Sequence, residues 1–176
     1  MTQSTKTEMD WFVIYTRSNA EKKLAEELES SGFHVFLPTY TTVRQWSDRK
    51  KKVITPLIKG IVFIQTTRKD LNKVYTFHHV RGVLKENAQP GIVREEEIQN
   101  LKIIAHEWNG DVIETNHSYN LEKGDEIEVE RGPFAGLTGE LVNINGKHRV
   151  VVRLRSLQVE FSVNVSLNAV RKINGE

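Results

Sequence analysis

The feature of this sequence that most constrains its fold is a change of hydrophobic pattern past the middle of the chain. Before residue 109, strand-like and helix-like segments alternate, whereas after residue 120 the apolar residues recur mainly at every second position. The stretch 109–120 has no clear period and few large apolar residues, which is typical of a linker. The sequence therefore predicts a mixed module over 9–108 and an all-β module over 121–174.

The mixed module opens with a predicted strand followed by a predicted helix. Residues 11–16 are aromatic or β-branched, which predicts a strand buried on both faces. Ser18 and Glu21 then have the spacing of a capping box, and apolar residues at every fourth position form one stripe on a helix. Gly32 is the kind of residue at which such a helix ends.

The rest of the mixed module alternates between the same two patterns. Residues 33–37, 57–65 and 80–84 have the apolar character of strands, and 95–108 has a helical stripe with an acidic first turn. A polar and basic stretch over 41–52 predicts a hairpin or an exposed loop. We therefore expect an α+β fold with a mainly antiparallel sheet flanked by helices.

The all-β module has the pattern of a small barrel. Apolar and polar residues alternate over 126–130, 150–155 and 159–165. Glycines at both ends of 132–136 indicate a turn, and Asn145-Gly146 is the strongest hairpin signal in the chain. Several short strands in so short a segment favour a barrel, because a barrel closes its own edges.

Composition excludes several classes of protein. Of the 176 residues, 38% are apolar and 27% are charged, the balance of a globular protein. No apolar run approaches the ~18 residues that a membrane span needs, and the polar start of the chain does not resemble a signal peptide. Because cysteine is absent, thiol catalysis, disulfides and cysteine-ligated metals are excluded. We expect a cytoplasmic protein with no membrane contact.

Motifs for catalysis are missing from the sequence. It contains no His-Glu-x-x-His, no Gly-x-Ser-x-Gly and no Walker-type phosphate loop. His78 and His79 are neighbours, so on a strand they would point in opposite directions and would not share a metal. The glycines of the all-β module precede no helix that could bind a phosphate. We expect no enzymatic activity, no cofactor and no metal.

One short basic segment is a candidate for nucleic-acid binding. Although the net charge of the chain is only +2, residues 44–52 hold five basic residues and one acidic residue around a tryptophan. The basic side chains would contact backbone phosphates, and the indole would stack on a nucleobase. A solvated hairpin tip remains the alternative interpretation. The candidate residues are Arg44, Trp46, Arg49, Lys50, Lys51 and Lys52.

Apolar residues are also dense on the strands predicted over 11–16 and 57–65. A sheet that helices cover on one face has a second face to account for, and an apolar second face is either another core or a docking patch. Periodicity alone leaves both interpretations open. The residues concerned are Trp11, Tyr15, Leu57, Ile58, Ile61 and Phe63.

Three segments resemble the NusG family of transcription elongation factors. Residues 11–16 with Glu21-Lys22-Lys23 and 36–39 look like the opening of the NusG N-terminal domain, and 56–64 is similar to its central strand. The sequence Gly-Asp-Glu-Ile-Glu-Val-Glu-Arg-Gly-Pro-Phe-Ala-Gly-Leu-Thr-Gly over 124–139 closely resembles a KOW motif. In length and style the chain looks most like the specialised UpxY-type antiterminators.

The resemblance implies a two-domain transcription factor with an SH3-like KOW barrel at its C-terminus. Such a protein docks on the clamp helices of RNA polymerase, bridges the DNA cleft and suppresses pausing or termination. The basic segment would lie near upstream DNA or the non-template strand, and the barrel would recruit a further partner; we expect a monomer. The alternative is a ribosome- or RNA-associated KOW protein. The implied polymerase-binding residues are Trp11, Tyr15, Ile58, Ile61 and Phe63.

Two segments depart from the pattern of the family. The central strand usually carries Pro-Gly-Tyr or Pro-Gly-Phe, where this chain has Lys59-Gly60-Ile61. An aliphatic residue thus replaces an aromatic anchor, and a charge is added beside it. Residues 154–158 lack the aromatic residue with which the housekeeping factor contacts Rho or a ribosomal protein. The second departure suits an antiterminator.

Overall fold

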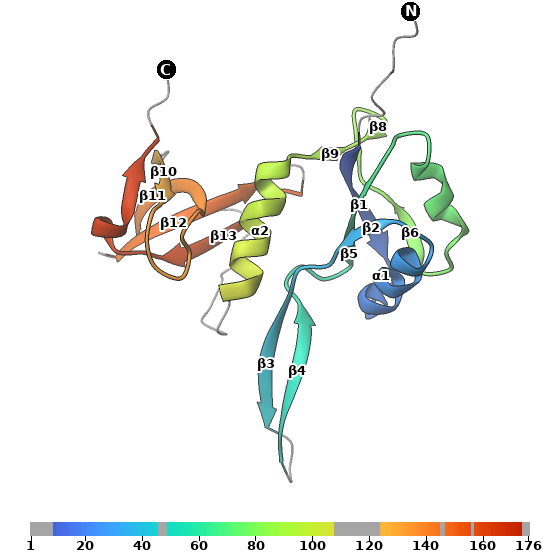
Figure 1. The fold of residues 1–176 in the computed structure, drawn as a ribbon, viewed down its shortest axis with the longest axis horizontal. Coiled ribbons are helices and arrows are strands. Elements are labelled where there is room, and N and C mark those ends of the chain that lie inside the picture. The colour runs from blue at the N-terminus through green and yellow to red at the C-terminus, as the bar shows by residue number, and fades with distance from the viewer. Residues whose placement is uncertain (1–8, 46–48, 108–123, 145–146, 156, 174–176) are drawn as a thin grey trace, which may run out of the picture. The chain divides into compact units, whose positions relative to one another are not determined.

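The computed structural model describes residues 9–45, 49–107, 124–144, 147–155 and 157–173 (Figure 1). Contacts divide the chain into two compact units. The first, called the N-terminal unit, comprises 1–39 and 56–95, and the second, called the C-terminal unit, comprises 40–55 and 96–176. The linker expected over 109–120 lies outside the described residues, so the domain limits read from the sequence stay a prediction.

The N-terminal unit is built on one antiparallel sheet with strand order β2-β5-β1-β6, to which β9 adds by pairing with β1. A two-stranded pair, β7 with β8, lies between β6 and β9 in sequence. The expectation of a mainly antiparallel sheet is confirmed. The elements are β1 (Asp10–Thr16), α1 (Glu21–Ser30), β2 (His34–Phe36), β5 (Ile61–Thr66), η1 (Leu71–Thr76), β6 (Val80–Val83), β7 (Lys85–Glu86), β8 (Gln89–Pro90) and β9 (Ile92–Val93).

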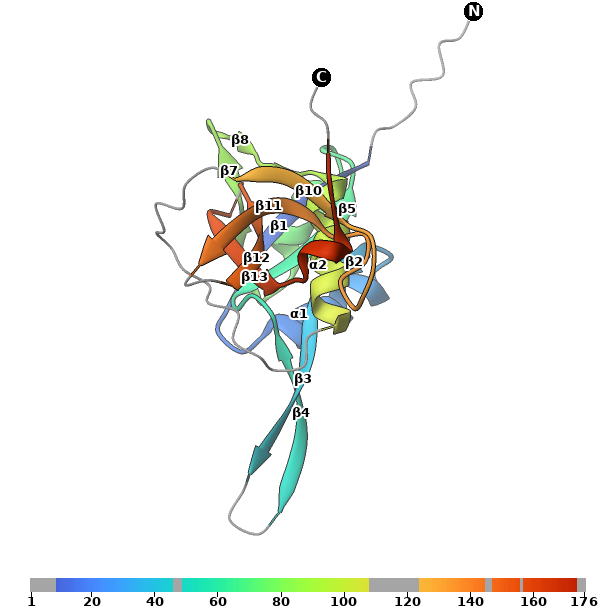
Figure 2. The same cartoon turned by 90° about the vertical axis from the view of Figure 1, so that its left-hand side faces the viewer.

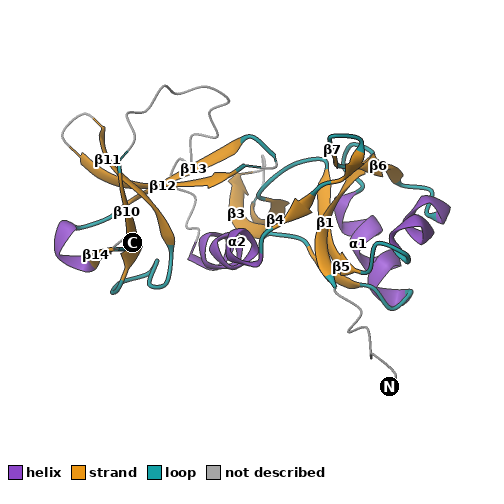
Figure 3. Cartoon of the chain, turned by 90° about the horizontal axis from the view of Figure 1, so that it is seen from above, coloured by secondary structure: helices purple, strands orange, loops and turns teal. Residues whose placement is uncertain are grey.

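One face of this sheet packs on the helix α1 and the short helix η1 (Figure 3). Successive side chains of a strand point to opposite faces, so Phe12 and Ile14 of β1 lie on the face that meets Leu24 of α1 and Val74 of η1. All four side chains have no exposed surface. This cluster is the hydrophobic core of the N-terminal unit.

The helix α1 does not begin with the capping box that the sequence predicts. Its N-cap is Ala20, which makes no side-chain cap hydrogen bond. The carboxylate of Glu21 accepts a hydrogen bond from the main-chain N–H of Gly60 at 2.8 Å. The prediction fails because the helix begins at Glu21 itself, so Ser18 is not its N-cap and Glu21 is not at the third helical position. The helix ends before Gly32, whose φ is +88°, as the sequence predicts.

The segment read as a hairpin or exposed loop forms a hairpin. Strand β3 (Thr39–Gln45) pairs with β4 (Lys50–Pro56) in a two-stranded sheet of its own. Figures 1 and 2 show the two strands twisting around each other. Residues 46–48 at its tip lie outside the described residues. An isolated two-stranded ribbon is only marginally stable in water, so this hairpin has little stability of its own.

The C-terminal unit contains a five-stranded sheet with strand order β13-β12-β11-β10-β14, in which all neighbours are antiparallel. Its apolar side chains are buried, among them Ile127, Val150 and Phe161. The turn predicted at Asn145-Gly146 lies outside the described residues. The elements are α2 (Glu95–Glu107), β10 (Asp125–Val129), β11 (Thr138–Ile144), β12 (Lys147–Leu154), β13 (Val159–Asn164), η2 (Leu167–Ala169) and β14 (Val170–Lys172).

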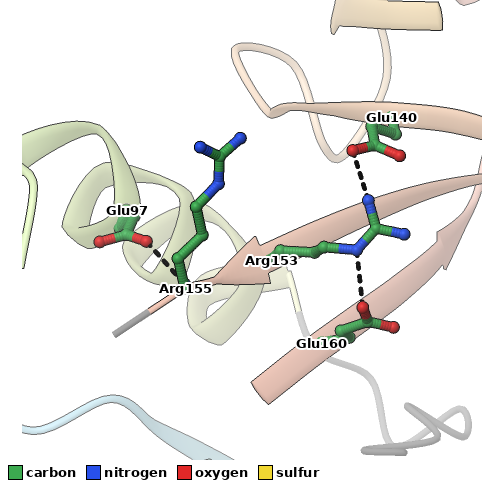
Figure 4. Close-up of polar contacts among 5 residues, drawn as sticks. All are labelled: Glu97, Glu140, Arg153, Arg155 and Glu160. Carbon is green, nitrogen blue, oxygen red and sulfur yellow. Dashed lines mark hydrogen bonds and ion pairs between the residues drawn. The ribbon is translucent and has the colours of Figure 1, made fainter. Parts of the chain in front are cut away.

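Helix α2 is tied to the C-terminal sheet from Glu96 onward. The buried side-chain amide of Asn100 donates to the main-chain oxygen of Thr138 and accepts from its N–H, both at 3.1 Å. Glu96 accepts from the Thr138 hydroxyl at 2.8 Å, and Glu97 accepts from the N–H of Arg155 at 2.9 Å (Figure 4). The sequence patterns do not predict this attachment, because they place the helix in the mixed module.

Candidate interaction surfaces

The second face of the N-terminal sheet is the candidate docking surface. On β1, Trp11 and Tyr15 alternate with the core residues and point to this face. Their partners across the ladder with β5 are Gln65 and Ile61, and Phe63 lies opposite Val13 between them. The expected site residues of these two strands therefore share one face, as the sequence predicts.

The polymerase-binding role implied by the resemblance requires these side chains to be open to solvent, and for three of them the structure contradicts this. Trp11 is 3% exposed, Ile61 4% and Phe63 0%. The ring of Trp11 packs against His34 and Phe36 of β2, with centroids 5.2 and 6.4 Å apart. Phe36 also packs against Phe63 at 5.9 Å.

A hydrogen bond further fixes Trp11. Its indole Nε1 donates to the Glu95 carboxylate at 2.7 Å. A buried indole N–H needs such a partner, and a bond to a charged acceptor is among the stronger ones in proteins. This side chain is thus part of the packed structure of the unit in the conformation described.

Tyr15 and the turn before β5 remain accessible. Tyr15 is 38% exposed, Ile58 is half-buried, and Lys59 beside it is exposed. The turn over 57–60 is held at its first residue by a hydrogen bond from the N–H of Leu57 to the Pro38 oxygen at 2.7 Å. Of the polymerase-binding residues expected from the sequence, Tyr15 and Ile58 are therefore the accessible ones.

The hairpin carries exposed basic residues and exposed apolar residues together. Arg49, Lys50, Lys51 and Lys52 are exposed at the start of β4. Arg44 lies on β3, where the structure describes its main chain. Trp46 lies outside the described residues. The structure thus brings three of the six predicted residues together on β4, with Arg49 immediately before them.

The sequence interpretation missed two further residues of the hairpin. Val43 is 59% exposed and Ile54 is 54% exposed. Contiguous exposed apolar patches mark contact surfaces, whereas single exposed apolar residues are ordinary. No alternation marks these two residues in the sequence, because Ile54 directly follows Val53 and Val43 lies three residues after Tyr40.

Electrostatic contacts in the C-terminal unit are structural in character. Arg153 lies between the carboxylates of Glu140 and Glu160, and its Nε donates to Glu160 at 2.6 Å (Figure 4). Burial alone would lower the pKa of Arg153, but hydrogen bonds to the two carboxylates outweigh it and raise the pKa. Glu140, Arg153 and Glu160 come from three adjacent strands, so this group links them side by side.

The titratable groups of the N-terminal unit form no metal site. Nη1 of Arg17 lies 3.0 Å from Nε2 of His78, and Nε2 of His79 lies 3.8 Å from Oε1 of Glu27. Within the described residues, no three His, Asp or Glu side chains are grouped so that they could hold a metal ion. In the same part of the chain, no helix is long and apolar enough to cross a membrane.

A family model described as "NusG: Transcription termination factor nusG" matches residues 9–102. The chain belongs to the NusG family. The match covers the N-terminal unit, the hairpin and most of α2, and so confirms the resemblance seen in the sequence.

Relatives from several organisms align with two thirds or more of the chain. The NusG of Rickettsia felis, named a transcription termination/antitermination protein, is 26% identical over 96% of this chain and 93% of its own length. The NusG of Thermus thermophilus is 25% identical over 83% of this chain and 90% of its own length. The transcription elongation factor Spt5 of Acidianus ambivalens is 24% identical over 69% of this chain and 72% of its own.

A solved structure supports the fold. The structure titled "Domain interaction in Thermotoga maritima NusG" superposes with a TM-score of 0.52 at 21% identity, covering 95% of this chain and 98% of that one. At this identity the likeness shows the fold alone. The UpxY-type specialisation read from the sequence stays a prediction.

Proposed function

We propose that this NusG-family chain is a transcription elongation and antitermination factor. The observation that carries the proposal is the family match over 9–102 together with relatives of that name along nearly the full chain. Such a factor acts in the cytoplasm by binding RNA polymerase and suppressing pausing or termination. It performs no chemistry of its own.

The polymerase contact in this proposal is made by the second face of the N-terminal sheet. Tyr15 and Ile58 are its accessible apolar side chains, and they meet the clamp helices directly. Trp11, Ile61 and Phe63 lie buried in the same face and act as its rigid support. By bridging the DNA cleft from this position, the factor favours a closed and processive polymerase.

The hairpin in this proposal contacts upstream DNA or the non-template strand. The four exposed basic residues over 49–52 supply the charge for phosphate contacts, and Arg44 and Trp46 are proposed to join them. The exposed Val43 and Ile54 add an apolar component that could pack on bases or sugars.

The C-terminal unit is proposed to contain an SH3-like KOW barrel. Support comes from its five antiparallel strands and from the KOW-like residues of 124–139. The barrel recruits a further partner of the transcription machinery. Domain limits of 9–108 and 121–174, with a linker over 109–120, are part of the same proposal.

A transcription assay tests the proposed function. The full chain is added to elongation complexes of purified bacterial RNA polymerase on a template with a strong pause, and the lifetime of the pause is measured. We expect a shorter pause and more read-through at a terminator. If the chain changes neither quantity and co-purifies with ribosomes instead of polymerase, the proposal is refuted.

Charge removal on the hairpin tests the nucleic-acid contact. Changing Arg49, Lys50, Lys51 and Lys52 to Gln should weaken binding to a DNA scaffold and flatten its salt dependence, because fewer counterions are released. The control changes the exposed bases Lys23, Arg68, Lys69 and Lys85 to Gln, which removes the same charge elsewhere. Equal losses in both variants would show that only net charge matters and that the hairpin is no specific contact.

A further inference from the structure

The N-terminal unit contains a buried carboxylate that the proposed function has not used. Glu21, the first residue of α1, is 6% exposed, and it is the one acidic residue in the buried class among the described residues. Burying a carboxylate is costly unless hydrogen bonds compensate for the lost water. The bond that the structure shows for this side chain runs from the N–H of Gly60 to Oε1 at 2.8 Å.

The partner of this carboxylate lies in the turn that presents Ile58. Gly60 has a φ of +78°, a conformation that other residues adopt only with strain. Its carbonyl oxygen accepts a hydrogen bond from the N–H of Thr16 at 2.9 Å. Both main-chain groups of Gly60 are therefore fixed, the N–H by α1 and the C=O by the end of β1.

The position of Glu21 on its helix reduces the free-energy cost of burying its carboxylate. A negative charge in the first turn of a helix is stabilised by the helix dipole, which offsets part of the cost of burial. The same location means that the carboxylate moves only with α1, and α1 packs on the core through Leu24 and Leu28. The position of the turn is therefore fixed by a contact with the core helix α1 as well as by its flanking strands.

We propose that Glu21 is the positioning residue of the polymerase contact made by the turn 57–60. It holds the N–H of Gly60 so that Ile58 is presented in one fixed orientation to the partner. The inference rests on the proposed function, because the partner is RNA polymerase. Glu21 itself does not touch the polymerase, so its effect on affinity passes entirely through the turn.

Two variants and two measurements test the role. In Glu21→Ala, the amide hydrogen of Gly60 should exchange with solvent about tenfold faster, and affinity for purified core polymerase should fall about tenfold, because a charge-assisted hydrogen bond is lost. Glu21→Gln keeps an acceptor oxygen and should retain affinity to within about threefold. Glu29→Ala, at an exposed site of the same helix, is the matched control and should behave as wild type.

A double-mutant cycle separates positioning from a general effect on stability. If Glu21 acts through the turn, Ile58→Ala should weaken binding in the wild type but change little in the Glu21→Ala background. If Glu21 only stabilises the unit, the two losses should add. Additive losses, or a Gly60 exchange rate that Glu21→Ala leaves unchanged, would overturn the inference.

The two measurements also distinguish the failure of the inference from the failure of the proposed function. A wild-type chain without affinity for polymerase would refute both, whatever the exchange rates show. A wild-type chain that binds, together with a Glu21→Ala variant that binds equally well, would refute the positioning role alone and leave the proposed function intact.

Discussion

Each of the two units uses one buried polar side chain to satisfy main-chain groups of a segment far away in sequence. In the N-terminal unit, Glu21 accepts one hydrogen bond from Gly60, 39 residues away. In the C-terminal unit, Asn100 both donates to and accepts from the main chain of Thr138, 38 residues away. The Glu21 contact is one hydrogen bond to a carboxylate, whereas the Asn100 contact is a pair of hydrogen bonds in which a neutral amide both donates and accepts.

The difference between the two contacts reflects what each one replaces. The ladder between β11 and β12 begins at Glu140, so it offers no pairing to Thr138, and the amide of Asn100 takes that place. At Gly60 the carbonyl oxygen already accepts a hydrogen bond from the N–H of Thr16, so Glu21 supplies an acceptor only for the remaining N–H. We infer that Asn100 contributes chiefly to stability, and that Glu21 contributes chiefly to local geometry.

The largest effect is expected for Asn100→Ala. Two main-chain groups of the half-buried Thr138 would lose the buried Asn100 amide as their partner, which should lower the free energy of unfolding by about 2–4 kcal/mol. Chemical denaturation of the full chain measures the change. Asn164→Ala, at an exposed position of β13, should cost almost nothing. Comparable losses at the two sites would show that the reciprocal bonds are not what matters.

Glycine substitutions sharpen the comparison at an intermediate size of effect. At Gly139 of β11, an added Cβ would lie 2.5 Å from the Val151 oxygen, so Gly139→Ala should cost about 1–3 kcal/mol through a steric clash. At Gly60 nothing lies within 4 Å of such a Cβ, and Gly60→Ala should cost only about 1 kcal/mol, from its positive φ. The midpoints of thermal unfolding compare the two. The reverse order would contradict the account.

The smallest effect is expected at an exposed carboxylate. The Lys73 ammonium, 2.8 Å from Oδ1 of Asp70, and the Thr67 hydroxyl, 3.0 Å from Oδ2, lower the pKa of Asp70 below its ordinary value of 3.8. A lowered pKa in the folded state stabilises the protein above pH 3.8, and this contribution is lost as the pH falls through the folded-state pKa.

Asp70→Asn should therefore slightly reduce the acid sensitivity of stability. Denaturation curves between about pH 2 and pH 6 check the sign. A variant whose stability falls more steeply in acid than that of the wild type would contradict the assignment.

Local patterns predicted most elements of the fold. The strand over 11–16 and the helix over 95–108 agree with β1 (Asp10–Thr16) and α2 (Glu95–Glu107), because apolar period and propensity are properties of neighbouring residues. The capping box was wrong because the helix begins at Glu21 itself, and the carboxylate of Glu21 accepts from the distant N–H of Gly60. The attachment of α2 to the C-terminal sheet likewise depends on contacts that no local pattern contains.

The candidate site was predictable in its face but not in its exposure. Alternation along the strands placed Trp11 and Tyr15 on one face correctly. It could not tell that Trp11 would be covered by His34 and Phe36 of β2, because strand order is not written in the period of one strand. The basic hairpin was predictable, since charge and turn residues alone keep such a segment in water.

The central claim, that the turn 57–60 meets RNA polymerase, is tested most directly by site-specific photo-crosslinking. A photoreactive amino acid replaces Ile58 in the full chain, and Tyr75, which is 54% exposed on η1, is replaced in the control. Helix η1 packs on the other face of the sheet. The account predicts crosslinks from position 58, and not from position 75, to the polymerase subunit that carries the clamp helices. Crosslinks from position 58 only to ribosomal proteins or RNA would contradict it.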